Sequence, residues 1–473
     1  MKQHLARLRS RIRVLSRAAL CLAASGCAGF RREPLDPRAE LAALRSRGDL
    51  TRIVEHRRPG EDAAAREDRF DPTDGLDEAE LVTVALTLNP AIQARRLEAG
   101  EARSALLAAG IWPNPELELS SRPGLGTPGT AIELDFLFEI LSPWKRSAAK
   151  AAAGFRVDEV TASIAAEEWR LAGKVRSRHW EVVFLERSLA AIEEEARLRR
   201  RVAVEMRAGV AAGERSELDA SLAELDLAEA RRRERRARTA LEAARRELCT
   251  LLGLPSAYPL RLEASEKPAE VAVYEDLTDG ELERRLLEGR FELRAAEAAY
   301  RRAEEELRLA VLEQIPGPKV GPSFERDSGG GHTLGVGLGI EVPLFDRKQG
   351  EIKEKRARRD RLRAEYAAVL HRLLAEAEGA RERVRRAKLD LEAQERELLP
   401  ILARSESLVE EAFRARELSL NEFATARERA LRLRLDYLEA LFAYRSGLAE
   451  LEAALGTRLE RPATHATGNR SPP

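Results

Sequence analysis

The chain repeats itself at an offset of 203 residues, and this duplication limits its fold more than any other feature of the sequence. Pairs of residues related by the offset occur in the same order in both copies: Pro113 and Pro316, Pro115 and Pro318, Ser216 and Ser419, Leu252 and Leu455, Gly253 and Gly456. An internal repeat of this kind means that one structural unit is built twice. We expect each unit to contain a helix, a pair of strands, a very long helix, a tight turn and a long returning helix.

Each copy contains two short segments with a two-residue alternation. The clearest has an apolar row, Ile132, Leu134, Phe136, Phe138 and Ile140, and a mostly acidic row, Glu133, Asp135, Leu137 and Glu139. The four predicted strands are Glu116–Ser121, Thr130–Leu141, Lys319–Glu325 and His332–Val342. In a water-soluble protein the apolar row would cover a core, and in a porin-like wall it would face lipid while the acids face a wet lumen. The sequence shows no second apolar layer, which favours the membrane interpretation.

Long helices account for most of the remaining sequence. The predicted helices are Asp77–Ala109 with a break at Asn89-Pro90, Lys145–Ala208, Ser216–Leu252, Glu281–Gln314, Gly350–Ala415 with a kink at Pro400, and Leu420–Leu455. The second of them alone would be on the order of 100 Å long. Apolar residues recur along it every three to four positions between Glu and Arg, which is typical of a coiled-coil seam with solvated flanks.

The first 26 residues are predicted to be an export signal. Six basic residues precede a short apolar segment, Ala18–Ala24, that is too short to span a bilayer. Ala24-Ser25-Gly26-Cys27 resembles a bacterial lipobox, in which cleavage leaves Cys27 as a lipidated N-terminus. The other interpretation is an ordinary small-residue cleavage site that contains a cysteine. No later run of eighteen apolar residues occurs, so no transmembrane helix is expected.

The sequence predicts neither an enzyme nor a cofactor site. Without the signal the chain carries 75 basic and 81 acidic residues, which argues against a nucleic-acid partner. Cys249 would be its only cysteine besides Cys27, and none of the six His pairs at metal-ligand spacing. The glycines Gly335, Gly337 and Gly339 alternate within a predicted strand, which is not the spacing of a phosphate-binding loop.

Several short motifs, taken in order, resemble TolC-type outer-membrane efflux proteins. They are Leu88-Asn89-Pro90, Pro113-Asn114-Pro115-Glu116-Leu117, Val342-Pro343-Leu344-Phe345 and the two Leu-Gly helix ends. The resemblance covers about Asp77 to Gly456, and heavy-metal efflux members share its general layout. It implies a mainly α fold with a small β part: a homotrimer whose four strands per chain form a shared 12-stranded transmembrane β-barrel, continued by a periplasmic tunnel of helical hairpins.

The resemblance also implies a function and partners. Such proteins are outer-membrane channels of tripartite efflux systems: passive ducts that dock to a periplasmic adaptor (membrane fusion) protein and an inner-membrane pump, often of the resistance-nodulation-division type. Others are ducts for type I secretion. Glu133, Asp135, Glu139 and Glu341 would then face the barrel lumen. A lipid-anchored periplasmic coiled-coil scaffold without a pore is the alternative, but it gives the alternating strands no purpose.

In this family the hairpin turns lie near the tunnel mouth and the adaptor-docking surface, where a Gly precedes an acid by six positions. Gly213 and Asp219 match, with Gly209 in the same turn, whereas in the second copy Arg416 replaces the Gly and Glu422 keeps the acid. Rings of carboxylates from three chains would favour cations there. Alternatively, Asp219 and Glu422 only stabilise the first turn of a helix, as acids do.

The predicted organisation follows from the repeat. Residues 1–26 are a lipoprotein-type signal, 27–75 a tether, 76–255 the first efflux repeat, 256–280 a connector, 281–457 the second repeat and 458–473 a disordered tail. The expected location is the outer membrane of a Gram-negative-type envelope, with a lipid anchor at Cys27.

Overall fold

The computed structural model describes residues 30–47, 50, 75–123, 130–140, 143–263 and 276–459. The predicted export signal, Cys27, most of the tether and nearly all of the predicted tail lie outside these residues. The chain divides into two compact units, with the boundary between Ser46 and Arg47. The first unit contains helix α2 (Pro37–Arg45), and the second contains all the elements described below.

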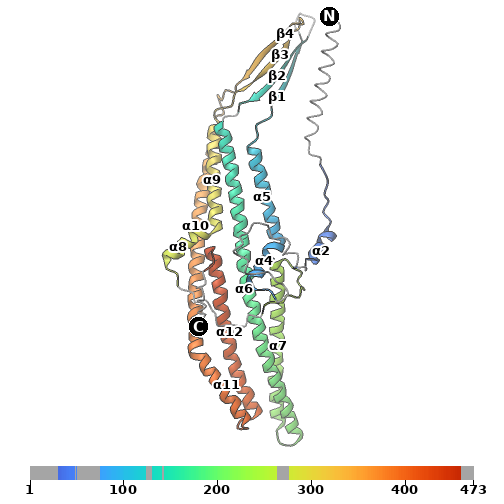
Figure 1. The fold of residues 1–473 in the computed structure, drawn as a ribbon, viewed down its shortest axis with the longest axis vertical. Helices are drawn as coiled ribbons and strands as arrows, with labels where there is room; N and C mark the ends of the chain where they lie inside the picture. Colours follow the sequence, from blue (N-terminus) through green and yellow to red (C-terminus); the bar gives the residue numbers. More distant parts are fainter. Residues whose placement is uncertain are drawn as a thin grey trace, which may run out of the picture. The chain divides into compact units, whose positions relative to one another are not determined.

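Helices make up most of the second unit (Figure 1). They are α4 (Glu78–Leu88), α5 (Pro90–Ala109), α6 (Pro143–Ala211), α7 (Glu217–Leu252), α8 (Asp279–Gly289), α9 (Phe291–Leu312), α10 (Gln349–Ala393), α11 (Leu399–Arg414) and α12 (Leu420–Leu455), with a π-helical turn η2 (Gln394–Leu398) between α10 and α11. None of the described helices is both long and apolar enough to cross a bilayer. The sheet lies at one end of α6, and the hairpin turns lie at the other.

The four strands form one antiparallel sheet in the order β1-β2-β3-β4. They are β1 (Glu116–Pro123), β2 (Thr130–Glu139), β3 (Lys319–Arg326) and β4 (His332–Gly339). The central pairing joins the two copies, since Leu134 of β2 lies opposite Phe324 of β3. Strands β1 and β4 are the outer strands, and each pairs with only one strand of this chain.

The two copies have the same local geometry where their helices end. Gly253 and Gly456 both follow a long helix in the left-handed conformation, at φ 74°. A Cβ on Gly253 would lie 2.6 Å from the Leu88 carbonyl oxygen, and a Cβ on Gly456 would lie 2.4 Å from that of Gly289. The end of each returning helix therefore presses directly, backbone to backbone, on a break between two other helices. Asn89 at the first break also donates to the Leu251 carbonyl, at 2.9 Å.

The second of these breaks was not predicted from the sequence. Instead of one helix from Glu281 to Gln314, the structure has α8 and α9, separated at Arg290. The cause is a tertiary contact: Arg290 leaves helical geometry, and its Nη1 donates to the Ala453 carbonyl at 2.6 Å. At Pro400, where we predicted a kink, the regular helix is interrupted by η2, because proline lacks the N–H that would close the preceding turn.

Buried charges as well as apolar residues hold the two copies together. The guanidinium of Arg176 in α6 lies between Glu78 of α4, at 3.4 Å, and Glu452 of α12, at 3.5 Å. Burial raises the pKa of Glu452, and it lowers that of His179, one turn further along α6. Nδ1 of His179 has no hydrogen-bonding partner among the described residues. The described helices therefore enclose a desolvated polar belt beside the apolar core.

Candidate functional site

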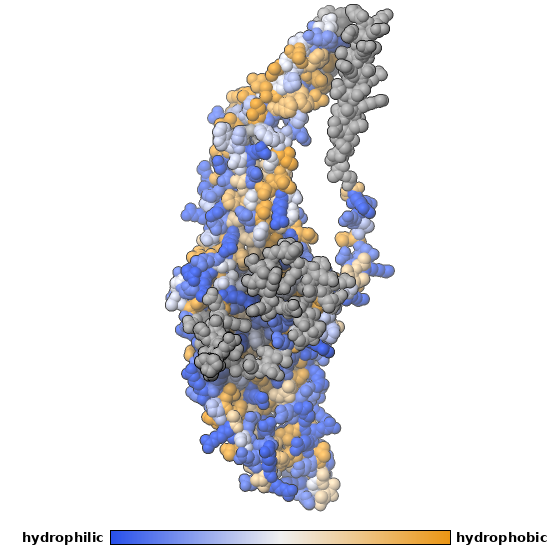
Figure 2. All heavy atoms as spheres, viewed as in Figure 1, coloured by the Kyte–Doolittle hydropathy of each residue, from blue (hydrophilic) through white to orange (hydrophobic). Residues whose placement is uncertain are grey.

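One face of the sheet is apolar across all four strands. In register, Leu119 pairs with Leu134, Leu134 with Phe324, and Phe324 with Leu334. On β4 the exposed fractions of Leu334, Val336 and Leu338 are 80%, 76% and 74%. Figure 2 shows apolar residues gathered over this part of the second unit. No described element covers this face, so water alone would contact an apolar surface of a kind that soluble monomers rarely expose.

The opposite face of the sheet is charged or formed by glycine. Its acids are Glu116, Glu118, Glu133, Asp135, Glu139 and Glu325, and its bases are Arg122 and Lys319. Both bases are paired: Arg122 with Glu133 at 2.7 Å and Lys319 with Glu116 at 2.6 Å. The predicted lumen-facing residues Glu133, Asp135 and Glu139 are therefore on one face, away from the apolar row.

Glu341 is an exception, because the prediction that it lies on a lumen-facing strand is wrong. Strand β4 ends at Gly339, which pairs with Lys319 at the start of β3. The partner chain beyond Lys319 is Pro316-Gly317-Pro318, in which neither proline has an N–H to extend the ladder. Glu341 therefore lies in the connection between β4 and α10.

The first hairpin turn has the geometry that its sequence predicts. Gly213 adopts φ 76°, and its N–H donates to the Val210 carbonyl at 3.0 Å. The Gly209 carbonyl accepts from the N–H of Glu214 at 2.9 Å. This arrangement closes the end of α6 with a left-handed glycine, as many helices end.

The second turn repeats these bonds with a different residue. Arg416 takes the place of Gly213 and adopts a left-handed conformation as well, at φ 61°. Its N–H donates to the Phe413 carbonyl at 3.1 Å, and the N–H of Glu417 donates to the Ala412 carbonyl at 2.9 Å. The replacement of glycine by arginine therefore leaves the turn intact, with backbone strain that a glycine would avoid.

The two predicted tip acids form capping boxes. Asp219 accepts from the Ser216 N–H at 3.1 Å and from its hydroxyl at 2.8 Å, and the corresponding distances for Glu422 and Ser419 are 2.9 Å and 2.8 Å. The Ser216 hydroxyl lowers the pKa of Asp219, and the Ser419 N–H lowers that of Glu422. Both acids are thus charged and exposed, and both hold the first turn of a returning helix.

The two tips pack against each other through a shared apolar cluster. It contains Val202, Ala203 and Met206 of α6, Ala220 and Ala223 of α7, and Leu420, Phe423 and Ala424 of α12. The rings of Phe413 and Phe423 stack within it, with centroids 4.3 Å apart. The hairpins therefore form one body at this end.

A buried ionic network lies beside this cluster. The side chain of Arg199 in α6 is only 4% exposed and contacts Asp226 of α7 at 3.1 Å and Glu428 of α12. Glu195, also buried, pairs with Arg233 of α7 at 2.5 Å. Burial raises the pKa of Glu195; it opposes ionisation of Glu428 too, but hydrogen bonds from Arg432 and Arg199 outweigh it and lower the pKa of Glu428. The network therefore links three helices from both copies.

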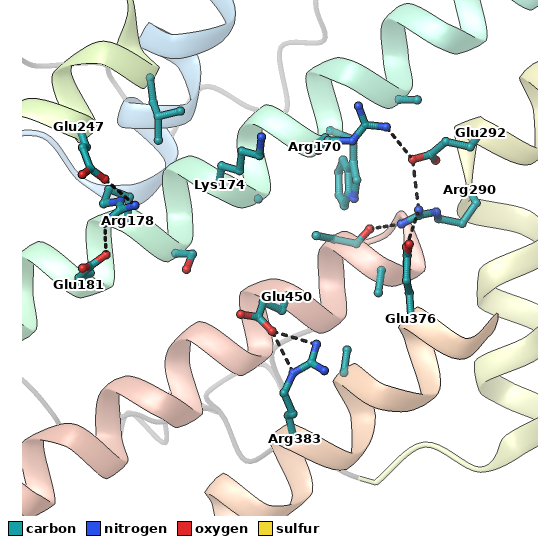
Figure 3. A pocket seen from close by; sticks show the side chains of 18 of the residues that line it. Arg170, Lys174, Arg178, Glu181, Glu247, Arg290, Glu292, Glu376, Arg383 and Glu450 are labelled. Carbon is teal, nitrogen blue, oxygen red and sulfur yellow. Dashed lines mark hydrogen bonds and ion pairs between the residues drawn. The ribbon is translucent and has the colours of Figure 1, made fainter. Parts of the chain in front are cut away.

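A groove of about 940 Å³ lies where α6, α7, α9, α10 and α12 meet (Figure 3). It is lined by five cations, Arg170, Lys174, Arg178, Arg290 and Arg383, and five carboxylates, Glu181, Glu247, Glu292, Glu376 and Glu450. Most of these charges are paired, for example Arg383 with Glu450 at 3.0 Å. The groove is therefore close to neutral, unlike the acidic face of the sheet.

Within the described residues, no group of three His, Cys, Asp or Glu is placed to hold a metal ion. Cys249 is buried in the apolar core of the first copy, and burial raises the pKa of its thiol.

Comparisons with known proteins give a match in structure alone. No protein-family model matches the sequence, and no curated protein matches it. Among solved structures, CusC, studied for its folding and transmembrane channel formation, is 18% identical with a TM-score of 0.64 over 81% of this chain and 94% of that chain. The outer membrane protein VceC of Vibrio cholerae is 17% identical with a TM-score of 0.63 over 81% and 97%. The open-state outer membrane channel MtrE of Neisseria gonorrhoeae is 16% identical with a TM-score of 0.60 over 81% and 90%. At these identities the likeness establishes a shared fold.

Proposed function

We propose that this chain, which has the TolC-like fold of outer-membrane channel proteins, is itself the outer-membrane duct of a tripartite efflux system. The observation that carries the proposal is the two-faced sheet: an uncovered apolar face on Leu119, Phe136 and Val336 and an acidic, glycine-lined face behind it. An apolar surface toward lipid with a wet surface behind it is the pattern of a transmembrane barrel wall. The duct is passive, since substrate would be driven by a separate pump.

The assembly we propose is a homotrimer. Strands β1 and β4 have unpaired outer edges within one chain, and an unpaired edge is not stable in lipid. Three copies, each contributing four strands, would pair β1 with β4 of the next copy and close a 12-stranded barrel. The helices of each copy would then continue the barrel as a periplasmic tunnel.

The partners follow from the same proposal. The hairpin tips, farthest from the sheet, would meet a periplasmic adaptor and an inner-membrane pump, which we assign to the resistance-nodulation-division type. The placement of Asp219 and Glu422 at the exposed tips supports a role in docking or gating. Cys27 would anchor the chain by a lipid, and residues 76–255 and 281–457 would be the two efflux repeats.

A matched set of variants separates a gating role of the tip acids from their capping role. Asp219→Asn and Glu422→Gln remove the charges but keep an oxygen that accepts from the serine N–H. Ser216→Ala and Ser419→Ala keep the charges but remove the hydroxyl that caps the helix. A gate formed by carboxylate rings predicts changed conductance and cation selectivity in the first pair only. Equal effects in both pairs would show that the acids act as caps.

The experiment that tests the duct itself uses Cys27→Ser, which removes the proposed lipid anchor. We expect the purified variant to require detergent, to have the mass of a trimer and to give discrete single-channel openings in a planar bilayer. The scaffold alternative predicts a water-soluble, non-conducting protein. That result would refute the duct, because a chain without an anchor or a barrel has no reason to remain in the membrane. Efflux and type I secretion would be distinguished by the inner-membrane transporter with which the purified complex co-purifies.

A further inference from the structure

The connections between the sheet and the helices share a feature that the duct does not by itself explain. Each of the four connections exposes at least one large apolar side chain; we call this set the junction collar: Trp112 before β1, Trp144 after β2, Ile315 before β3, and Leu344 with Phe345 after β4. Trp144 is 66% exposed and Phe345 is 91% exposed. We propose that the junction collar lies at the phospholipid headgroup surface on the helix side of the membrane and sets the depth at which the sheet is inserted. This inference rests on the proposed duct.

Contacts between the connections hold the collar at one level. Lys145 Nζ donates to the Ile315 carbonyl at 2.5 Å, which joins the second and third connections. Arg146 donates to the Gly110 carbonyl at 2.6 Å and lies over the Trp112 ring, 5.2 Å from its centroid, which joins the first and second. The collar is therefore a ring fixed by the fold rather than a set of unrelated exposed residues.

The chemistry of the collar fits a headgroup layer better than it fits water or hydrocarbon. Tryptophan has an apolar ring and a polar N–H, and it concentrates at membrane–water interfaces for that reason. Cations accompany the aromatic residues: Lys145, Arg146 and Lys150 follow Trp144, and no acidic residue occurs in 140–157. The phosphates of phospholipids are the complementary charges at this depth.

The length of the strands agrees with this placement. Strands of about 9–11 residues cross a bilayer when tilted, and those described here have eight to ten. The apolar face ends on the far side at Arg326 and His332, which lie opposite each other. With the collar at one water boundary, these polar residues reach the other.

The distribution of tryptophan provides a direct test. The chain has four tryptophans, and the two outside the collar, Trp169 and Trp180, lie within α6. A Trp169→Phe/Trp180→Phe variant of the full chain reports on the collar alone, and the reciprocal Trp112→Phe/Trp144→Phe variant is its matched control. Both are reconstituted into phosphatidylcholine vesicles brominated either near the headgroup or near the chain ends, and conductance is recorded from the same preparations.

We expect the emission of the collar reporter to be quenched more by bromine near the headgroup than by bromine near the chain ends, and that of the control by neither. Stronger quenching by the chain-end bromines, or no quenching in a protein that conducts, would overturn the collar while leaving the duct intact. Absence of both quenching and conductance would overturn both. If the double variant does not fold, because Trp180 loses its bond to Glu78, Trp144→Phe in the native chain must still lose part of the headgroup quenching.

Discussion

Arg416 illustrates how a single unfavourable residue is accommodated when its surroundings fix the backbone. A left-handed conformation costs a residue with a Cβ about 1–2 kcal/mol. Two bonds hold it nevertheless: its own N–H to the Phe413 carbonyl, and that of Glu417 to the Ala412 carbonyl. The same two bonds occur around Gly213, where the backbone is relaxed. The second tip therefore stores strain that the first does not.

We expect Arg416→Gly to stabilise the second tip by about 0.5–1 kcal/mol, the relieved strain less the greater entropy that glycine has in the unfolded chain. Gly213→Ala is the counterpart and should destabilise the first tip by a similar amount. Hydrogen exchange of the amides at the start of α12 and of α7 measures the two effects separately. Unchanged exchange at α12 in Arg416→Gly would show that the conformation is not strained.

His179 predicts a dependence of stability on pH. Burial holds its pKa in the folded chain below the value of about 6.5 in the unfolded chain. The unfolded state therefore binds the proton more readily, so stability is fully present above about pH 6.5 and falls as the pH drops below it. Thermal unfolding between about pH 7 and about pH 5 measures this loss. It should be smaller in His179→Leu; an identical profile in both proteins would assign the acid sensitivity to other groups.

At the scale of helices, the long hairpins are held together by buried charges as well as apolar contacts. Arg199 bridges helices of both copies from a nearly buried position, whereas Arg238 pairs with Glu193 and Glu234 at the surface. Removing one partner of a buried pair leaves the others desolvated and unpaired, while a surface pair is screened by solvent.

Arg199→Met is therefore expected to cost about 1.5–3 kcal/mol, the range for a lost hydrogen bond to a charged group. Arg238→Met, the matched surface control, should change stability little. Chemical unfolding in detergent, followed by circular dichroism, compares the two. A loss of stability in Arg238→Met equal to that in Arg199→Met would contradict the role of burial.

Within the sheet, Gly321 lies where β3 approaches β2 most closely. A Cβ at this position would be 1.8 Å from the Phe136 carbonyl oxygen, whereas one at Gly335 would contact nothing within 4 Å. We expect Gly321→Ala to prevent pairing of β2 with β3 and to abolish the detergent-resistant trimer on gels. Gly335→Ala should leave it intact, and a stable trimer in Gly321→Ala would show that the strands separate at no cost.

The sequence predicted the elements well where local chemistry determines them. The break at Asn89-Pro90, the capping serines Ser216 and Ser419 and the end of α7 at Leu252 all come from residues whose backbone preferences are strong. The break at Arg290 was missed because neither proline nor a capping side chain marks it. Its cause is a contact with Ala453, more than 160 residues away.

At the scale of the whole molecule, the apolar face of the sheet has no cover within the described chain. The alternation predicted both faces, and the register of the four strands confirms that Leu119, Phe324 and Val336 share one of them. The groove and the buried ionic network could not be predicted, since they depend on how helices distant in sequence cross. The role of the tip acids stays a prediction, because their geometry serves a cap and a gate equally.

The proposed lipid face gives a prediction for insertion. Val336→Arg places a charge in the apolar row of β4 and should cost about 2–4 kcal/mol of insertion if that residue lies near the middle of the bilayer. Thr333→Arg, on the opposite face of the same strand, should insert normally and alter ion selectivity instead. The fraction of each variant recovered in the outer membrane measures insertion. Normal insertion of Val336→Arg would exclude contact of this face with lipid.

The direct backbone contacts at Gly253 and Gly456 have a mechanical consequence. Each returning helix ends against the start of another helix, and no side chain lies between the glycine and the carbonyl oxygens of Leu88 and Gly289. Side chains can rotate and yield under compression, whereas hydrogen-bonded backbone in contact with backbone cannot. A push applied along the helices at their tips would therefore reach the other end with little shortening, so the protein resembles a rigid strut more than a spring.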